Sequence, residues 1–189
     1  MSNITVQDNF LPIDFFRNLQ SKLVSPDFPW YLSGTVRDDD TEHSPLWHND
    51  SDTFGENNYQ LVHVAYHSYG FSSDLLSDEV TVLAEKINAA AFLKIKCNLV
   101  QRRSNIEEWG LHNDVRHAPE NSLTSVLYMN TNNGYTRFET GEKVESVENR
   151  FVTFPNRIQH TGTTNNCNAP FRCVMNINWI KKLNNGETI

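Results

Sequence analysis

The sequence predicts a mainly β protein with helices in its N-terminal part. Before Phe92, apolar residues recur at helical spacing in two segments. After Phe92 they fall in short alternating runs broken by Asn, Gly, Thr or Pro. The chain has 189 residues, of which 38% are hydrophobic and 11% aromatic. At about 150 residues per domain this length fits one domain, and the apolar content is enough to form a packed core. The close spacing of the alternating runs indicates that the β part forms a sandwich or a barrel.

Both predicted helices are amphipathic. In Phe10–Val24 the apolar residues keep helical spacing, and Pro12 lies where the first turn of a helix tolerates proline. Asp74–Phe92 also repeats apolar side chains at helical spacing, and the acidic residues in its first turn suit the helix dipole.

The remaining segments are predicted to be extended or looped. Trp30–Val36 and Gln60–Tyr66 look extended, and the polar, turn-rich loop Arg37–Asn58 between them could lie over a site as a flap. Eight further strands are expected, at Ile95–Arg102, Gly110–Val115, Thr124–Asn130, Thr136–Glu139, Lys143–Val147, Phe151–Phe154, Gln159–Gly162 and Phe171–Ile180.

We divide the expected single domain into three parts. Residues 1–94 hold the N-terminal helices and their flanking strands, residues 95–180 form the β core, and residues 181–189 form a polar tail. The tail has too little apolar content to dock strongly on the rest of the domain.

Charge and cysteine content narrow the class of partner and compartment. The net charge of −7 opposes bulk nucleic-acid binding, which needs clustered Lys and Arg. Cys97, Cys167 and Cys173 show no paired spacing and read as reduced thiols. The chain starts without a cationic, apolar leader and contains no apolar run of membrane-spanning length. We therefore expect a cytoplasmic protein with no membrane partner.

A metal site is indicated by His112 and Asp114. On an extended backbone, residues two apart point to the same face, so both side chains could reach one ion. His160, from a distant strand, is the natural third ligand. Two histidines and one carboxylate on one side of an ion form the facial triad that leaves open positions on non-haem Fe(II).

An anion-binding residue is expected on the last strand. Alternation places Arg172, Val174 and Asn176 on one face of Phe171–Ile180 and apolar side chains on the other. A guanidinium that points into a small barrel is costly unless an anion meets it. The distal carboxylate of 2-oxoglutarate would be met there by a bidentate fork.

The ordered set of His112, Asp114, His160 and Arg172 resembles the signature of the 2-oxoglutarate/Fe(II) oxygenases. The nearer likeness is to the prolyl-hydroxylase-like branch and its small phage and marine-bacterial members. It covers roughly residues 95–179. Three further stretches are similar to strands of that branch: Tyr128-Met129-Asn130, Gly134-Tyr135-Thr136-Arg137-Phe138 and Asn149-Arg150-Phe151-Val152-Thr153-Phe154-Pro155.

The resemblance implies a double-stranded β-helix (jelly-roll) core, with the N-terminal helices packed behind its larger sheet. It implies Fe(II) held by His112, Asp114 and His160, with 2-oxoglutarate as co-substrate and dioxygen at the remaining position. Oxidative decarboxylation of 2-oxoglutarate would then be coupled to hydroxylation of a small-molecule or peptide substrate. A proline-like or other amino-acid side chain is the substrate class suggested by analogy.

The resemblance also implies three co-substrate contacts. Arg172 and Tyr128 would bind the distal carboxylate of 2-oxoglutarate, and Asn98 would touch the co-substrate from the first core strand. Relatives often carry Asn-x-Tyr on that strand, whereas this chain has Val100 at the third position. This departure suggests that the co-substrate is gripped slightly differently.

Two other function classes remain open on the sequence. One is a catalytically silent β-helix module that binds a ligand or a partner. The other is a cupin-like metal enzyme that does not use 2-oxoglutarate, although the His-x-His with a following Glu that such enzymes carry is missing. A second His-Asn-Asp, at His48-Asn49-Asp50, lacks a matching distal histidine and arginine, so we expect solvent exposure or substrate contact there. The substrate and the oligomeric state are left open.

Overall fold

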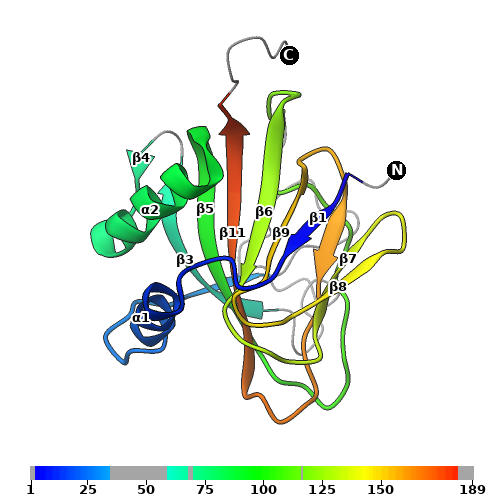
Figure 1. Cartoon of the computed structure of the whole chain (residues 1–189). Helices are drawn as coiled ribbons and strands as arrows, with labels where there is room; N and C mark the ends of the chain where they lie inside the picture. The colour runs from blue at the N-terminus through cyan, green and yellow to red at the C-terminus, as the bar shows by residue number, and fades with distance from the viewer. Residues whose placement is uncertain (1–2, 35–58, 68–69, 116, 183–189) are drawn as a thin grey trace.

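The computed structural model describes residues 3–34, 59–67, 70–115 and 117–182 (Figure 1). The expected flap Arg37–Asn58, with His48-Asn49-Asp50 inside it, lies outside the described residues, as does the tail from residue 183.

A large antiparallel sheet forms the centre of the molecule (Figure 1). Among the described residues it has eight strands, in the order β1-β9-β6-β11-β5-β3-β2, and β4 pairs with β3 at one side. The strands are β1 (Thr5–Gln7), β2 (Tyr31–Gly34), β3 (Tyr59–His67), β4 (Gly70–Phe71), β5 (Ala89–Gln101), β6 (Ser122–Tyr128), β9 (Phe151–Pro155) and β11 (Phe171–Lys181).

A smaller sheet lies against this one. Within the described ranges it has three antiparallel strands, β7 (Tyr135–Phe138), β8 (Lys143–Glu145) and β10 (His160–Gly162), in the order β10-β7-β8. The two antiparallel sheets form the jelly-roll core, and the expected fold class is confirmed.

The N-terminal helices cover the other face of the large sheet (Figure 1). They are α1 (Ile13–Leu23), the short 3-10 helix η1 (Asp74–Leu76) and α2 (Ser77–Ile87). Pro12 is the residue that precedes α1, as its fixed φ favours. In the described part of the chain, no helix has both the length and the apolar character needed to cross a bilayer.

The second helix is shorter than predicted. Asn88 adopts a left-handed conformation, with φ of 54°, and ends α2, so the residues up to Phe92 belong to β5 instead. There Phe92 pairs with Trp179 of β11. The apolar run Ala89–Phe92 suits a helix or a buried strand equally well, and pairing with a neighbouring strand decides between them.

Alternation on β11 separates the two faces of the large sheet as predicted. Cys173, Met175 and Ile177 pack in the cluster beneath the helices. Val174 packs on the opposite face, between the two sheets. Arg172 therefore points into the space between the sheets, where the candidate site lies.

Candidate metal centre

His112 and Asp114 lie on a loop between β5 and β6 rather than on the predicted strand Gly110–Val115. Only His112 forms a β-bridge, with His160 at the start of β10. Its backbone N–H donates to the carbonyl of His160 at 3.0 Å, and the N–H of His160 returns a bond at 3.1 Å. The chain bends at Asp114, so a bridge and a turn, not strand alternation, bring the carboxylate to the imidazoles.

The three predicted ligands converge on one point. His112 Nε2 lies 3.7 Å from Asp114 Oδ1, and His160 Nε2 lies 3.6 Å from Asp114 Oδ2. One ligand atom from each residue lies within 4.8 Å of the others. The side chains of His160 and Asp114 are only 4% and 6% exposed, which keeps bulk water away from this point.

Protonation of these groups favours a cation between them. His112 Nδ1 lies 3.0 Å from the carbonyl oxygen of Gly110, which can only accept, so this nitrogen carries a hydrogen and Nε2 is the lone-pair nitrogen of the neutral ring. Burial lowers the pKa of His160 to about 4, despite the opposing charge of Asp114, so its imidazole is neutral. Burial would raise the pKa of Asp114, but the neighbouring His112 and His160 and the charge of Lys96 hold it well below its usual range. Two imidazoles and a carboxylate are the donor set that divalent iron accepts.

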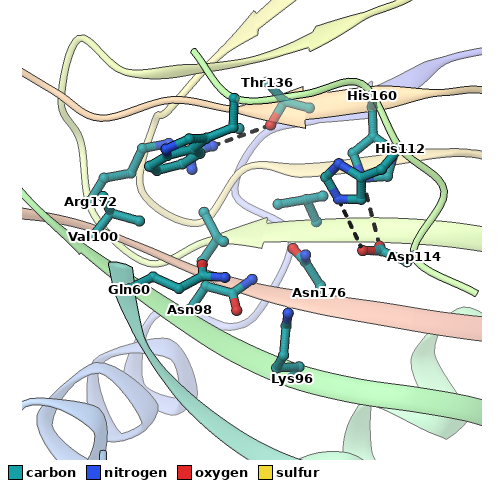
Figure 2. Close-up of a pocket in the computed structure, with 14 residues that line it drawn as sticks. Gln60, Lys96, Asn98, Val100, His112, Asp114, Thr136, His160, Arg172 and Asn176 are labelled. Atoms are coloured by element: carbon teal, nitrogen blue, oxygen red, sulfur yellow. Dashed lines mark hydrogen bonds and ion pairs between the residues drawn. The ribbon is translucent and has the colours of Figure 1, made fainter. Parts of the chain in front are cut away.

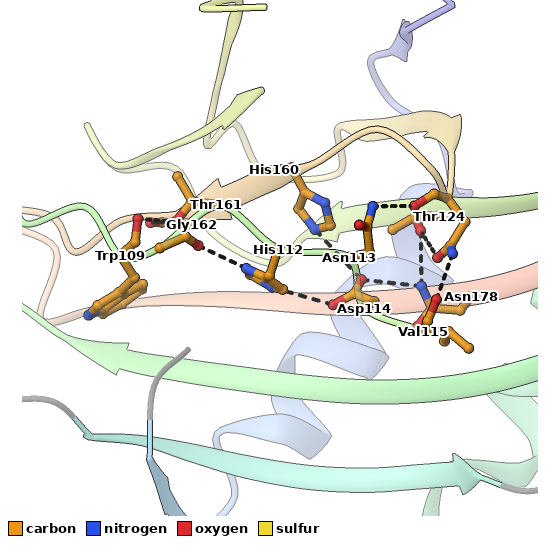
Figure 3. A network of polar contacts seen from close by, with 12 residues as sticks. Trp109, His112, Asn113, Asp114, Val115, Thr124, His160, Thr161, Gly162 and Asn178 are labelled. Carbon is orange, nitrogen blue, oxygen red and sulfur yellow. Dashed lines mark hydrogen bonds and ion pairs between the residues drawn. The ribbon is translucent and has the colours of Figure 1, made fainter. Parts of the chain in front are cut away.

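A hydrogen-bond network behind the ligands fixes the loop (Figure 3). Asn178 of β11 is 1% exposed and donates both amide hydrogens, to Asp114 Oδ2 at 3.2 Å and to Thr124 Oγ1 at 3.0 Å. Thr124 donates to Asn156 Oδ1 at 3.0 Å, and Asn156 donates to the carbonyl of Val115 at 2.9 Å. Such partners orient a carboxylate ligand and strengthen metal binding.

A cavity opens from the ligands toward the other end of the sheets (Figure 2). Its volume is about 60 Å³. The walls come from both sheets and from the loop that carries His112: Gln60, Lys96, Asn98, Val100, Trp109, His112, Asp114, Val126, Thr136, His160, Gly162, Arg172, Val174 and Asn176.

Arg172 forms the far end of this cavity. It is 3% exposed, with Nε donating to Ser146 Oγ at 2.8 Å and Nη2 to Thr136 Oγ1 at 3.2 Å. Burial lowers its pKa from the usual value, against the effect of Tyr128. No carboxylate of a described residue forms an ion pair with it. The two hydrogen bonds use two of the five N–H donors of a guanidinium, so donors remain for an anion.

Tyr128, for which a direct contact with the co-substrate was expected, is not among the residues that line the cavity. It is fully buried in the cluster between the sheets. Its hydroxyl donates to Thr136 Oγ1 at 2.8 Å, with the carbonyl of Val144 at 3.3 Å. The cavity-lining group is Thr136, whose oxygen accepts from both Tyr128 and Arg172. Its own O–H is therefore left to donate to a ligand.

Asn98 lines the cavity, as expected of a co-substrate contact. It is 7% exposed, and its Oδ1 has no hydrogen-bond partner among the residues that the structure describes. Val100 lines the wall beside it. Lys96, two residues earlier on β5, also points into the cavity and was not predicted. Burial, together with the charge of Lys94, lowers the pKa of Lys96 to about 8, although the charge of Asp114 acts in the opposite direction.

Comparisons with known proteins show the fold. No family model and no curated protein matches the sequence. Solved structures do match. A prolyl-4-hydroxylase from Pseudomonas putida is 14% identical, with a TM-score of 0.61 over 96% of this chain and 94% of that one. An oxidoreductase of the 2OG-Fe(II) oxygenase family from Burkholderia pseudomallei is 9% identical, with a TM-score of 0.64 over 95% and 86%.

A third solved structure with this fold is that of an epimerase, not a hydroxylase. It is the non-heme alpha-ketoglutarate-dependent epimerase SnoN from nogalamycin biosynthesis, 11% identical, with a TM-score of 0.62 over 95% of this chain and 79% of that one. At these identities the likeness establishes the fold alone, and for the fold it confirms the resemblance to prolyl hydroxylases and related oxygenases.

Proposed function

We propose that this chain, which shares its fold with 2-oxoglutarate/Fe(II) oxygenases, is itself such an oxygenase and hydroxylates an amino-acid side chain, free or in a peptide. In this proposal His112, Asp114 and His160 hold Fe(II), and Arg172 with Thr136 binds the distal carboxylate of 2-oxoglutarate. Asn98 contacts the co-substrate from the opposite wall.

The placement of the triad and the arginine in one cavity carries the proposal. A Cβ atom on Gly162 would lie 3.3 Å from Arg172 Nη1, so the guanidinium lies against Gly162. Gly162 is two residues from His160 on β10, about 7 Å along a strand. A metal at one end of this interval and a guanidinium at the other suit a short dicarboxylate that chelates through its keto acid.

The residues of this chain position the reactants and exclude water. The triad binds on one side of a metal ion and leaves the positions toward the cavity open to co-substrate and dioxygen. Val126 and Val174 line the cavity with apolar surface between the two ends. When bound, Fe(II) and 2-oxoglutarate supply the oxidising chemistry, with succinate and carbon dioxide as products. The protein supplies geometry and a dry site.

Hydroxylation is the outcome we propose, although the fold also supports epimerisation in SnoN. Two measurements distinguish these outcomes. Purified protein with Fe(II), 2-oxoglutarate and air is assayed for succinate against amino acids, peptides and nucleosides. Each compound that stimulates turnover is then analysed by mass spectrometry for the gain of one oxygen atom.

The control for this assay removes one of the proposed metal ligands. Asp114→Ala should abolish succinate formation. His67→Gln, an exposed histidine at the end of β3, should leave it unchanged. Well-folded, iron-loaded wild-type protein that forms no succinate with any compound would count against an oxygenase and in favour of a binding module.

A further inference from the structure

A polar wall faces the metal ligands from the large sheet (Figure 2). It consists of Gln60, Lys96, Asn98 and Asn176, which come from the adjacent strands β3, β5 and β11. Lys96 and Asn176 are register partners, so their side chains enter the cavity side by side. This set can donate several hydrogen bonds to a small ligand.

Lys96 brings a positive charge to this wall. In the described ranges, no aspartate or glutamate forms an ion pair with its ammonium group. The side chain is half-buried. Lys94, on the same strand, repels its charge, and Asp114 attracts it without forming an ion pair. A partly desolvated cation in such a place is costly unless an anion binds beside it.

The charges of the loaded cavity do not balance. Its lining contains two cationic side chains, Lys96 and Arg172, and one anionic side chain, Asp114, and the two histidines bind a metal as neutral imidazoles. The two charges of Fe(II) and the two of 2-oxoglutarate cancel each other. One positive charge therefore remains after both have bound. A single carboxylate would neutralise it, whereas a phosphate dianion would exceed it.

Lys96 lies too far along β5 from Arg172 to share the distal carboxylate of the co-substrate with it. Arg172 pairs in register with Val100, and Lys96 lies four residues earlier on β5, about 13 Å along the strand. Of the two carboxylates of 2-oxoglutarate, one is met by Arg172 and the other chelates the metal. The ammonium group lies on the metal side of the cavity, on the wall opposite the metal ligands (Figure 2).

We propose that Lys96, with Asn176 beside it, binds a free carboxylate of the primary substrate. This inference rests on the proposed function. It narrows the substrate class to small carboxylic acids such as free amino acids and excludes residues in the interior of a peptide, which have no free carboxylate. The amide of Asn176 can donate a second hydrogen bond to the same carboxylate, and Gln60 lines the wall beyond it.

Matched acids and amides test the inference. Wild-type protein is loaded anaerobically with Fe(II) and saturating 2-oxoglutarate. Calorimetry then gives the Kd of L-proline and L-prolinamide, L-leucine and L-leucinamide, and other such pairs. We expect at least one acid to bind ten- to a hundredfold tighter than its amide, the range of a charge-assisted hydrogen bond. Lys96→Met should remove this preference, and Lys96→Arg should keep part of it.

Two controls show whether Lys96 binds a carboxylate of the substrate or one of 2-oxoglutarate. Lys94→Met removes the same charge from the same strand, outside the cavity lining, and should change the acid preference by less than about threefold, as expected of a partly exposed charge. The Kd of 2-oxoglutarate itself should change by less than twofold in Lys96→Met, which is within the scatter of such measurements. A rise in that Kd as large as the one caused by Arg172→Met would assign Lys96 to the co-substrate and overturn the inference.

The outcomes separate this inference from the proposed function. Iron-loaded wild-type protein that does not bind 2-oxoglutarate contradicts the proposed function and this inference together. Protein that binds 2-oxoglutarate but prefers no acid over its amide, or a Lys96→Met variant that keeps the preference, contradicts this inference alone.

Discussion

Replacing Arg172 by methionine should separate co-substrate binding from folding. The guanidinium is buried, holds Ser146 and Thr136 through one hydrogen bond each, and has no carboxylate partner among the described residues. Methionine keeps much of the side-chain length and removes the charge. The unliganded variant therefore lacks two hydrogen bonds of the wild type, but it also no longer buries an unpaired cation.

The expected magnitudes follow from these contacts. Loss of two charge-assisted hydrogen bonds to a carboxylate, each contributing about 1.5–3 kcal/mol, should raise the Kd of 2-oxoglutarate at least about a hundredfold. The free energy of unfolding should stay within about 2 kcal/mol of wild type, because removal of an unpaired buried charge offsets the lost hydrogen bonds. The Kd of Fe(II) should not change, because Arg172 does not touch the triad.

Calorimetric titration and urea unfolding of Arg172→Met measure these quantities. Arg17→Met, which removes an exposed arginine paired with Glu148, is the matched control and should leave the Kd of 2-oxoglutarate unchanged. A variant destabilised by more than about 3 kcal/mol, with an unchanged affinity for 2-oxoglutarate, would show that Arg172 is structural and refute the reasoning.

Three further predictions follow from the site and its surroundings. Asn178→Leu should weaken Fe(II) binding about ten- to a hundredfold in a metal titration, because the carboxylate of Asp114 loses its orienting donor; an unchanged Kd would contradict this role. In metal-free protein, burial lowers the pKa of His160 from 6.5 to about 4, so the unfolded chain binds a proton first as the pH falls. The free energy of unfolding should then fall between pH 6.5 and 4, by up to about 3 kcal/mol, and His160→Gln should flatten this dependence in urea titrations. Gly134→Ala should cost about 1–3 kcal/mol, because its Cβ would lie 2.7 Å from a backbone oxygen, whereas Gly70→Ala, with open space around it, should cost much less.

The sequence predicts the β core well because the side-chain period of a strand is strict. On β11 the alternation alone places Arg172 toward the cavity and Met175 toward the helices, as the structure confirms. The end of α2 is less predictable, because Ala89–Phe92 has no period of its own and pairs with β11 only in the folded sheet.

The metal ligands could be identified from their order and spacing in the sequence. The backbone conformation that holds them could not be predicted. His112 and Asp114 are joined by a bridge and a bend, a geometry that a strand pattern does not specify. Asn178 has the same strand parity as Arg172, so its direction was predictable. Its contact with Asp114 was not predictable, because it depends on how the loop that carries Asp114 folds back.

Lys96 and Thr136 show a second limit of the sequence. Both lie on strands at positions that alternation assigns to a face, yet a lysine or threonine there is most often exposed. Their importance comes from what surrounds them. Among the described residues no carboxylate forms an ion pair with Lys96, and two donors are already bonded to the oxygen of Thr136. Tyr128 shows the reverse, because its motif suggested a ligand contact and the packing between the sheets places it behind Thr136.

Anaerobic addition of Fe(II) and then 2-oxoglutarate tests the central claim most directly, since a ferrous ion chelated by the keto acid gives a visible charge-transfer band. We predict the band for wild-type protein and for His67→Gln, and its loss in His112→Ala, Asp114→Ala and His160→Ala. A folded wild-type protein without the band, or a band that survives removal of any one of the three ligands, would contradict a shared ferrous site.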